Sequence, residues 1–217
     1  WPELLRDLAA GRLKSRYDQA PDLSLAGRPF ARRDLHPRGT YTTTAVFEAT
    51  RACIHDCDFC VVPSAWGRVP LQKPVEEVVE DIRQHGKRRI LFVDLNLVSN
   101  LDYTTSLFEA LIPLDVQWYG LSTTRVTKDR ELLDLTTRSG CRGLLIGFET
   151  LSKANLRASS KGFHDPGQYR DVVAQLHRHG VALNGTFLFG LDEDTPKVFM
   201  ETARFAVEAA IDLPRFA

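Results

Sequence analysis

The 217-residue sequence lacks any long apolar run, because no stretch approaches the ~20 residues that a membrane-spanning helix needs. It also lacks net charge, since 28 Lys and Arg balance 28 Asp and Glu. A neutral chain argues against a broad nucleic-acid or anionic-membrane footprint, so we expect no nucleic-acid partner. The 43% of hydrophobic residues and 26% of charged residues are typical of a globular protein and exclude intrinsic disorder.

Cysteine is scarce, with four in the whole chain, yet three of the four fall within the segment 53–60. That spacing is too tight for a disulfide framework in a chain of this size. It indicates a metal site in a protein from a reducing compartment, for which the cytoplasm is the expected location.

The chain ends predict an excerpt from a longer protein. The first residues, Trp1-Pro2-Glu3, do not form a signal peptide and lack a starting Met. The last residues, 212–217, have no cap or polar tail. We therefore expect the chain to be cut near its C-terminus.

Strand-like and helical patterns alternate through most of the sequence. Strands are expected at 44–49, 89–94, 116–121, 143–148 and 181–189, with a sixth beginning near 213. Helices are expected at 74–82, 102–111, 129–138, 152–159 and 168–179, and from the Thr195-Pro196 cap to about 210. Five βα units and a sixth strand predict an α/β fold, a partial (β/α)6 TIM-like barrel with parallel strands that is truncated near strand 6. In such folds the chemistry lies at the carboxyl ends of the strands.

Two regions differ in composition. Residues 1–40 combine a short helical pattern at 3–10 with a lead-in rich in Pro and Gly, for which we expect little regular structure. Residues 41–217 form the expected barrel core.

The three clustered cysteines, Cys53, Cys57 and Cys60, follow the first strand of the core in a C-x3-C-x2-C pattern. Three thiolates within one loop can ligate three irons of a cubane iron–sulfur cluster. The fourth iron then lacks a nearby protein ligand. Such an open position is what a cluster needs in order to bind a substrate or cosubstrate directly.

Two alternatives remain open for these cysteines. A zinc-stabilised structural or binding module would take His55 or His36 as fourth ligand, although zinc sites favour paired C-x2-C units and the chain has one. An iron–sulfur electron carrier would take Cys141 as fourth ligand, but a small buried hydrophobe is the expected role of that residue. Metal content separates these hypotheses, because a cluster brings about four irons and a zinc site one ion.

The cysteine pattern, with the aromatic Phe59 just before the third cysteine, resembles that of the radical S-adenosylmethionine (radical SAM) superfamily. The chain is most similar to the branch whose members usually carry an upstream cobalamin-binding domain. The segments that carry this similarity are Thr50-Arg51, 92–96, 147–150 and 187–194. The resemblance covers about residues 42–217.

The resemblance implies an enzyme that uses a [4Fe–4S] cluster and SAM. Reductive cleavage of SAM would release methionine and a 5′-deoxyadenosyl radical, which takes a hydrogen atom from an organic substrate. Reactions of the branch include methylation and oxidative cyclisation or rearrangement in lipid, tetrapyrrole and natural-product metabolism. The implied partners are a small-molecule or lipid-like substrate and a one-electron reductant such as flavodoxin or ferredoxin. Cobalamin would be bound by a domain outside this chain.

The resemblance also implies roles for residues at the strand ends. Cys53, Cys57 and Cys60 would hold the cluster and so form the catalytic centre. Phe59 would pack near the adenine of SAM. Glu149, which ends the fourth strand, would accept hydrogen bonds from the ribose hydroxyls, with an exposed strand-end acid as the structural alternative.

The remaining implied contacts to SAM each have a structural alternative. Asp94 and Asn96 follow the second strand and would meet the amino-acid part of SAM, or would cap a turn. Ser122 and Arg125 would meet the ribose and the methionyl carboxylate, or would lie in a solvated loop. Two further residues follow the fifth strand, where Leu188 would pack on the adenine or in the core, and Gly190 would let the backbone approach the adenine.

Three other features have no assigned role. Asp34-x-His36-x-x-Gly39 matches a string found in cobalamin-binding domains, but it lies too close to Cys53 for such a domain to fit, so we interpret it as a coincidence. The segment 161–164 is expected to be a loop, with or without contact to substrate. His177 and His179 are expected to interact favourably with the helix dipole at the C-terminal end of their helix and need no ligand role.

Overall fold

The computed structural model describes residues 1–18, 24–37 and 39–217. Residues 19–23 and 38, which belong to the expected lead-in, lie outside the described residues. Within the described ranges, every helix is too short or too polar to span a bilayer.

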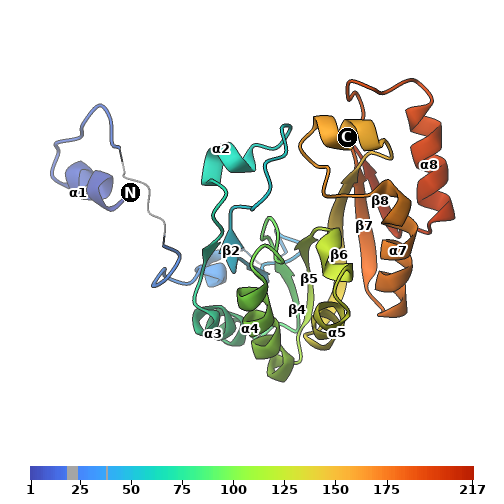
Figure 1. The fold of residues 1–217 in the computed structure, drawn as a ribbon. Coiled ribbons are helices and arrows are strands. Elements are labelled where there is room, and N and C mark those ends of the chain that lie inside the picture. Colours follow the sequence, from blue (N-terminus) through green and yellow to red (C-terminus); the bar gives the residue numbers. More distant parts are fainter. Residues whose placement is uncertain (19–23, 38) are drawn as a thin grey trace.

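A six-stranded parallel sheet forms the centre of the fold, in the order β1-β4-β5-β6-β7-β8 (Figure 1). The strands are β1 (Val46–Phe47), β4 (Arg89–Phe92), β5 (Gln117–Ser122), β6 (Cys141–Glu149), β7 (Ala182–Phe187) and β8 (Leu213–Phe216). Every neighbouring pair runs parallel. The predicted α/β partial barrel of six parallel strands is confirmed, and the sheet is open with β1 and β8 at its edges.

Helices connect these strands, and all but the short helix at 153–158 lie along the outer side of the curved sheet (Figure 1). They are α3 (Val75–His85), α4 (Leu101–Leu111), α5 (Arg130–Arg138), α6 (Lys153–Ala158), α7 (Tyr169–Arg178) and α8 (Val198–Glu208). The amphipathic pattern of α3 explains its place, because Val78 and Ile82 are buried while Glu76 and Glu77 occupy its first turn. Gly86 ends α3 in a left-handed conformation, which glycine adopts readily.

Two predicted helix starts are wrong. Helix α4 begins after Asn100, whose side chain accepts the N–H of Tyr103, and Asp102 lies inside the first turn. Helix α8 begins at Val198. Thr195 lies in the turn before it, where the carbonyl of Thr195 accepts the N–H of Val198. The Thr-Pro pair therefore precedes the helix and does not cap it.

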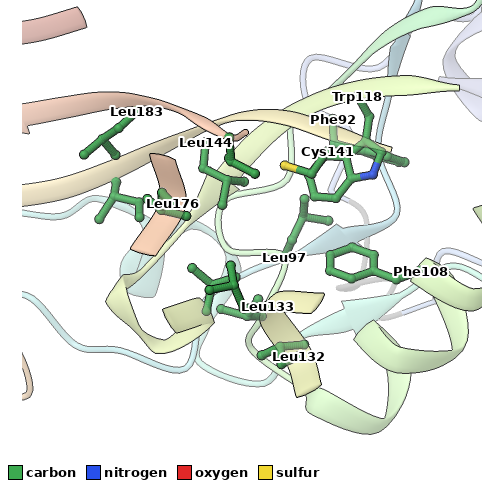
Figure 2. Close-up of a cluster of buried hydrophobic side chains, with 14 of the residues drawn as sticks. Phe92, Leu97, Phe108, Trp118, Leu132, Leu133, Cys141, Leu144, Leu176 and Leu183 are labelled. Carbon is green, nitrogen blue, oxygen red and sulfur yellow. The ribbon is translucent and has the colours of Figure 1, made fainter. Parts of the chain in front are cut away.

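The hydrophobic core lies between the sheet and its outer helices (Figure 2). Trp118 and Phe92 are completely buried and meet edge to face, with Phe108 tilted against the same indole. The indole N–H of Trp118 donates to Ser139 Oγ at 3.1 Å. Cys141 is buried beside these rings, as Figure 2 shows, and burial raises the pKa of its thiol. The expectation that it is a small buried hydrophobe is confirmed.

The described part of the lead-in docks on α3. The guanidinium of Arg33, in a short 3-10 turn (Arg33–Leu35), pairs with Asp81 at 2.7 Å and donates to the carbonyl of Val46. The same guanidinium stacks over the ring of Phe47 at 4.3 Å. The first helix, α1 (Pro2–Ala9), precedes the lead-in and forms the short helix expected there.

A two-stranded antiparallel ribbon was not predicted. It joins β2 (Thr50–Arg51) to β3 (Leu71–Gln72). Strands of two residues are too short to show a periodic pattern, so the sequence carries no signal for them. The ribbon closes the base of an excursion, residues 52–70, which holds the three clustered cysteines and helix α2 (Val62–Trp66).

Candidate metal centre and cofactor site

The cysteine loop, residues 53–60, begins beyond β1 and β2 at the carboxyl edge of the sheet. Cys53, Cys57 and Cys60 are half-buried free thiols. The N–H of Cys60 donates to the carbonyl of Cys57 at 2.9 Å, which closes a tight turn. Desolvation raises the pKa of the Cys57 thiol, and the nearby Lys161 opposes that effect.

The donor set fits a cluster better than a zinc ion. In the described ranges, no group of three or more His, Cys, Asp or Glu side chains converges to hold a single ion. A structural zinc needs four donors at about 2.0–2.3 Å from one point. A cubane cluster spreads three thiolates over three separate irons. The two histidines considered as zinc ligands lie in ring contacts instead, His55 stacked on Phe163 and His36 edge-on to Tyr41.

The fourth cysteine lies elsewhere. Cys141 is the first residue of β6 and is buried in the core at the amino end of that strand. The clustered cysteines follow the carboxyl end of the sheet. The geometry therefore does not bring Cys141 to the other three as a fourth ligand.

Asp94, just beyond β4, supports the backbone that leads into the cysteine loop. Its carboxylate is completely buried and accepts the N–H groups of Ala49, at 3.0 Å, and of Thr50. Burial raises the pKa of Asp94 to about 7, although these N–H donors act in the opposite direction. The sequence left two roles open for Asp94, contact with SAM or capping of a turn. The contacts seen here are those of a turn-capping residue.

Asn96 reaches the first cysteine directly. The side chain is 1% exposed, and its amide Nδ2 donates to Cys53 Sγ at 3.8 Å. The amide Oδ1 accepts the N–H of Val98 at 3.3 Å. Sequence reasoning placed Asn96 at this edge without anticipating a contact to a cysteine.

Glu149 ends β6 with a positive φ of 63° and forms a buried ion pair with Lys161. Lys161 Nζ lies 2.5 Å from Glu149 Oε1, and both side chains are about nine-tenths buried. Gly147 makes room for this pair, because a Cβ there would lie 2.1 Å from Oε1. The second carboxylate oxygen, Oε2, accepts no side-chain hydrogen bond from the described residues, so it is the oxygen available to a ligand hydroxyl.

The α6–α7 loop, residues 159–165, docks on the cysteine loop. The N–H of Asp58 donates to the carbonyl of Ser159 at 3.3 Å. In return, the hydroxyl of Ser160 donates to Asp58 Oδ1 at 2.8 Å. Two segments that are about a hundred residues apart in the chain thus form one rim of the site.

Ring contacts strengthen this docking. His55 stacks on Phe163 with ring centres 3.7 Å apart and planes 9° apart. The ammonium of Lys161 lies 5.8 Å from the ring centre of Phe59. The sequence analysis assigned no role to residues 161–164. The one hint of a role in the site was that a lysine, a phenylalanine and a histidine stand together in this loop.

His164 is buried beneath the same loop. Neither ring nitrogen has a hydrogen-bond partner in the described part of the chain. Burial lowers its pKa to about 3, and the positive charge of Lys161 acts in the same direction. The imidazole is therefore neutral over the physiological range.

The residues after β5 lie at the same edge. Ser122 is buried and its hydroxyl donates to the carbonyl of Thr123 at 3.1 Å. Arg125, in the 3-10 turn Thr124–Thr127, is half-buried, and its charge helps to lower the pKa of His55, although desolvation is the larger cause. Arg125 thus carries a positive charge near the cysteine loop.

The residues after β7 complete the edge. The N–H of Leu188 donates to the carbonyl of Glu149 at 2.7 Å, which ties the ends of two strands together. Gly190 adopts a φ of 86°, which favours glycine, and its N–H donates to Asp194 Oδ2. Leu188 therefore touches the Glu149 region directly, whereas Gly190 lies in an exposed turn beyond it.

Two histidines have local partners instead of a shared site. His177 Nε2 pairs with Asp212 at 2.8 Å, and His179 Nε2 pairs with Asp134 at 3.0 Å. Both lie at the C-terminal end of α7, as expected.

A cavity of about 920 Å³ lies at the opposite, amino-terminal end of the strands. Residues from the described segments 33–37 and 39–45 line it, together with the basic segment 87–89. Its lining includes none of the residues predicted to bind the cluster or SAM, so its size does not make it the reaction site.

Comparison with known proteins identifies the family. The family model described as "Radical SAM superfamily" matches residues 47–206. Bacteriochlorophyllide d C-12(1)-methyltransferase of Chlorobaculum tepidum is 30% identical over 100% of this chain and 50% of its own length. Anaerobic magnesium-protoporphyrin IX monomethyl ester cyclase of Synechocystis sp. is 24% identical over 73% of this chain and 33% of its own length. The chain thus spans half or less of these relatives.

A solved structure shares the fold. It is the radical SAM methyltransferase TsrM from Kitasatospora setae, with cobalamin and a [4Fe–4S] cluster bound. It matches with a TM-score of 0.72 and 17% identity, over 80% of this chain and 34% of that one. The predicted resemblance to the radical SAM superfamily is confirmed. With its three-cysteine loop at the carboxyl edge of an open parallel barrel, the chain belongs to the radical SAM superfamily.

Proposed function

We propose that this chain is the catalytic core of a radical SAM methyltransferase. The observation that carries the proposal is the loop of three free cysteines, docked against the rim that holds Glu149 and Lys161. In the proposal, Cys53, Cys57 and Cys60 ligate a [4Fe–4S] cluster. When bound, the cluster supplies one electron to SAM, whose reductive cleavage supplies a 5′-deoxyadenosyl radical.

In this proposal, side chains at the strand ends position SAM. Glu149 Oε2 accepts the ribose hydroxyls, while Lys161 holds Oε1 and so fixes the orientation of the carboxylate. Ser122 lies at the ribose side of the same edge. Arg125 supplies a positive charge for the methionyl carboxylate.

Apolar groups close the adenine side. Phe59 and Leu188 offer faces for the adenine ring, and Gly190 leaves room for the backbone to approach it. Asp94 and Asn96 hold the cysteine loop at the methionyl end, so their role in binding is to keep the first thiolate in place.

We further propose that the substrate is a tetrapyrrole and that the reaction is methylation at carbon. Support comes from the bacteriochlorophyllide methyltransferase, which matches the whole of this chain. Cobalamin would be held by a part of the protein outside this chain. The electron would come from a flavodoxin or ferredoxin in the cytoplasm.

A second candidate is oxidative ring closure on the same class of substrate. It is favoured by the similarity to the magnesium-protoporphyrin IX monomethyl ester cyclase. Methylation and cyclisation differ in the fate of the substrate radical, so they share the cysteine loop and the SAM contacts proposed above.

Anaerobic reconstitution tests the core proposal. After addition of iron and sulfide, we expect about four irons per chain and, on reduction with dithionite, an electron paramagnetic resonance (EPR) signal that changes shape when SAM is added. Cys57→Ser should lose the SAM-responsive signal, whereas Cys141→Ser, a matched change in the core, should keep it. One zinc per chain, or a cluster signal that ignores SAM, would overturn the proposal.

The protein with all its domains separates the two reactions. With methyl-labelled SAM and a bacteriochlorophyllide acceptor, methylation transfers the label to the macrocycle. Cyclisation is assayed separately with magnesium-protoporphyrin IX monomethyl ester, where it adds no label and forms a new ring. Absence of both products would refute the tetrapyrrole assignment while leaving the cluster result intact.

A further inference from the structure

Asn96 is the one side chain outside the cysteine loop whose hydrogen bond to a clustered cysteine is seen among the described residues. Its Nδ2 lies 3.8 Å from Cys53 Sγ, within reach of an N–H···S hydrogen bond. The side chain is 1% exposed, so water competes little for this donor. The donor is therefore shielded from water, while the Cys53 sulfur that it meets is half-buried.

The orientation of this amide is determined by a second contact. Asn96 Oδ1 accepts the N–H of Val98 at 3.3 Å, in a local turn just beyond β4. A flipped amide would present its oxygen to the sulfur and lose both hydrogen bonds. The NH2 group must therefore face Cys53.

The backbone that leads to Cys53 is held by the same end of β4. The carboxylate of Asp94 accepts the N–H groups of Ala49 and Thr50, four and three residues before the cysteine. Ala52, immediately before it, is buried with a φ of 76°, a conformation that non-glycine residues adopt only where their surroundings impose it. The end of β4 thus holds both partners of the N–H···S contact.

We propose that Asn96 sets the reduction potential of the cluster through its hydrogen bond to the Cys53 thiolate. The inference rests on the proposed function, because it requires that Cys53 ligates a [4Fe–4S] cluster. A reduced cluster carries one more negative charge, part of which lies on the thiolate sulfurs. A donor at one sulfur stabilises the reduced form more than the oxidised form and so raises the potential. Asn96 is in this sense a positioning residue that tunes the cofactor.

An EPR redox titration of the reconstituted chain tests the proposal. In Asn96→Leu, which has similar size and no donor, we expect the equilibrium constant for one-electron reduction to fall roughly tenfold, which is about 59 mV for a one-electron couple. Asn96→Asp keeps an acceptor for the N–H of Val98 but cannot donate to the thiolate when ionised. Its potential should fall at least as far as that of the Leu variant.

The neutral Leu variant tests the loss of the donor without adding charge. A wild-type potential in Asn96→Leu would show that the hydrogen bond to Cys53 does not affect the cluster, and that result would overturn the proposal. Asn184→Leu removes a half-buried amide from the middle of β7 and is the matched control, whose potential should not change. If the Leu variant assembles no cluster, Asn96→Ala, which is also neutral and lacks the donor, takes its place. Loss of the cluster in both variants would make Asn96 a folding residue and would equally overturn the proposal.

Failure of the proposed radical SAM function can be told apart from failure of the inference about Asn96. A wild-type chain that binds no cluster refutes the proposed function before any variant is compared. A wild-type cluster that responds to SAM, with equal potentials in wild type, Asn96→Leu and Asn96→Asp, refutes only the inference about Asn96.

Discussion

Gly147 shows how one missing side chain shapes the site at the residue scale. A Cβ at this position would lie 2.1 Å from Glu149 Oε1 and 3.0 Å from Lys161 Nζ. Both atoms are the far ends of flexible side chains, so a methyl group could be accommodated if the carboxylate moved. The residue therefore affects where Glu149 points more than whether the chain folds.

We predict that Gly147→Ala weakens SAM binding without unfolding the protein. The methyl group displaces the Glu149 carboxylate, so SAM affinity should fall about tenfold, which corresponds to about 1.4 kcal/mol. Because the displaced atoms can relax, the free energy of unfolding should fall by less than about 1 kcal/mol. Equilibrium dialysis with the reconstituted protein and urea unfolding measure the two quantities.

Gly162→Ala is the matched control for this change. It adds the same methyl group in the α6–α7 loop, where the nearest atom, Arg157 Cγ, is 3.6 Å away. Its SAM affinity should stay at the wild-type value. Wild-type affinity in Gly147→Ala would contradict the placement of Glu149 at the ribose.

At the scale of elements, the turns that end the helices decide how each βα unit meets the sheet. Gly140, between α5 and β6, adopts a φ of 99°, and a Cβ there would lie 1.9 Å from the carbonyl oxygen of Val116. Its own carbonyl accepts the N–H of Trp118. Gly86 ends α3 in a similar left-handed conformation, but a Cβ there would meet open space.

We predict that these two glycines respond very differently to alanine. Gly140→Ala forces two strand-edge backbones apart and should lower the free energy of unfolding by more than about 3 kcal/mol. Gly86→Ala carries only the cost of a left-handed alanine, about 1 kcal/mol. Urea unfolding followed by tryptophan fluorescence measures both, since Trp118 is fully buried. Equal losses in the two variants would show that the contact with Val116 contributes nothing.

At the scale of the whole molecule, buried titratable groups couple stability to pH. Burial lowers the pKa of His164 to about 3, so the folded state keeps it neutral while the unfolded chain takes up a proton below pH 6.5. This contribution to stability is complete above pH 6.5 and is lost as the pH falls toward 3. Asp94 acts in the opposite direction: its pKa is raised to about 7, so its contribution is lost as the pH rises from 3.8 toward 7.

We predict that His164→Phe makes the protein more resistant to acid. Between pH 7.5 and pH 5, the free energy of unfolding of the variant should fall by about 1 to 2 kcal/mol less than that of the wild type. Taking the difference between the two proteins cancels the contribution of Asp94, which both retain. Urea unfolding at the two pH values gives the result. His36→Phe, at an exposed position, should follow the wild type, and parallel losses in all three proteins would argue against a neutral buried His164.

The sequence by itself determined the order of strands and helices and the existence of the three-cysteine loop. Periodicity of apolar residues and the spacing of Cys53, Cys57 and Cys60 are local properties, so they can be read without coordinates. Two helix starts could not be read from the local sequence, because capping depends on which nearby side chain reaches the free N–H groups of the first turn. The side chain of Asn100 caps α4, whereas the side chain of Thr195 does not cap α8. The short β2–β3 ribbon left no pattern to read.

Only the tertiary structure decided which residues meet at the rim. The Glu149–Lys161 pair, the His55 ring on Phe163 and the amide of Asn96 at Cys53 join residues 12, 108 and 43 positions apart. Such contacts depend on the curvature of the sheet and on the direction of each side chain where its strand ends. The sequence can place those residues at one edge of the sheet, but side-chain geometry selects their partners.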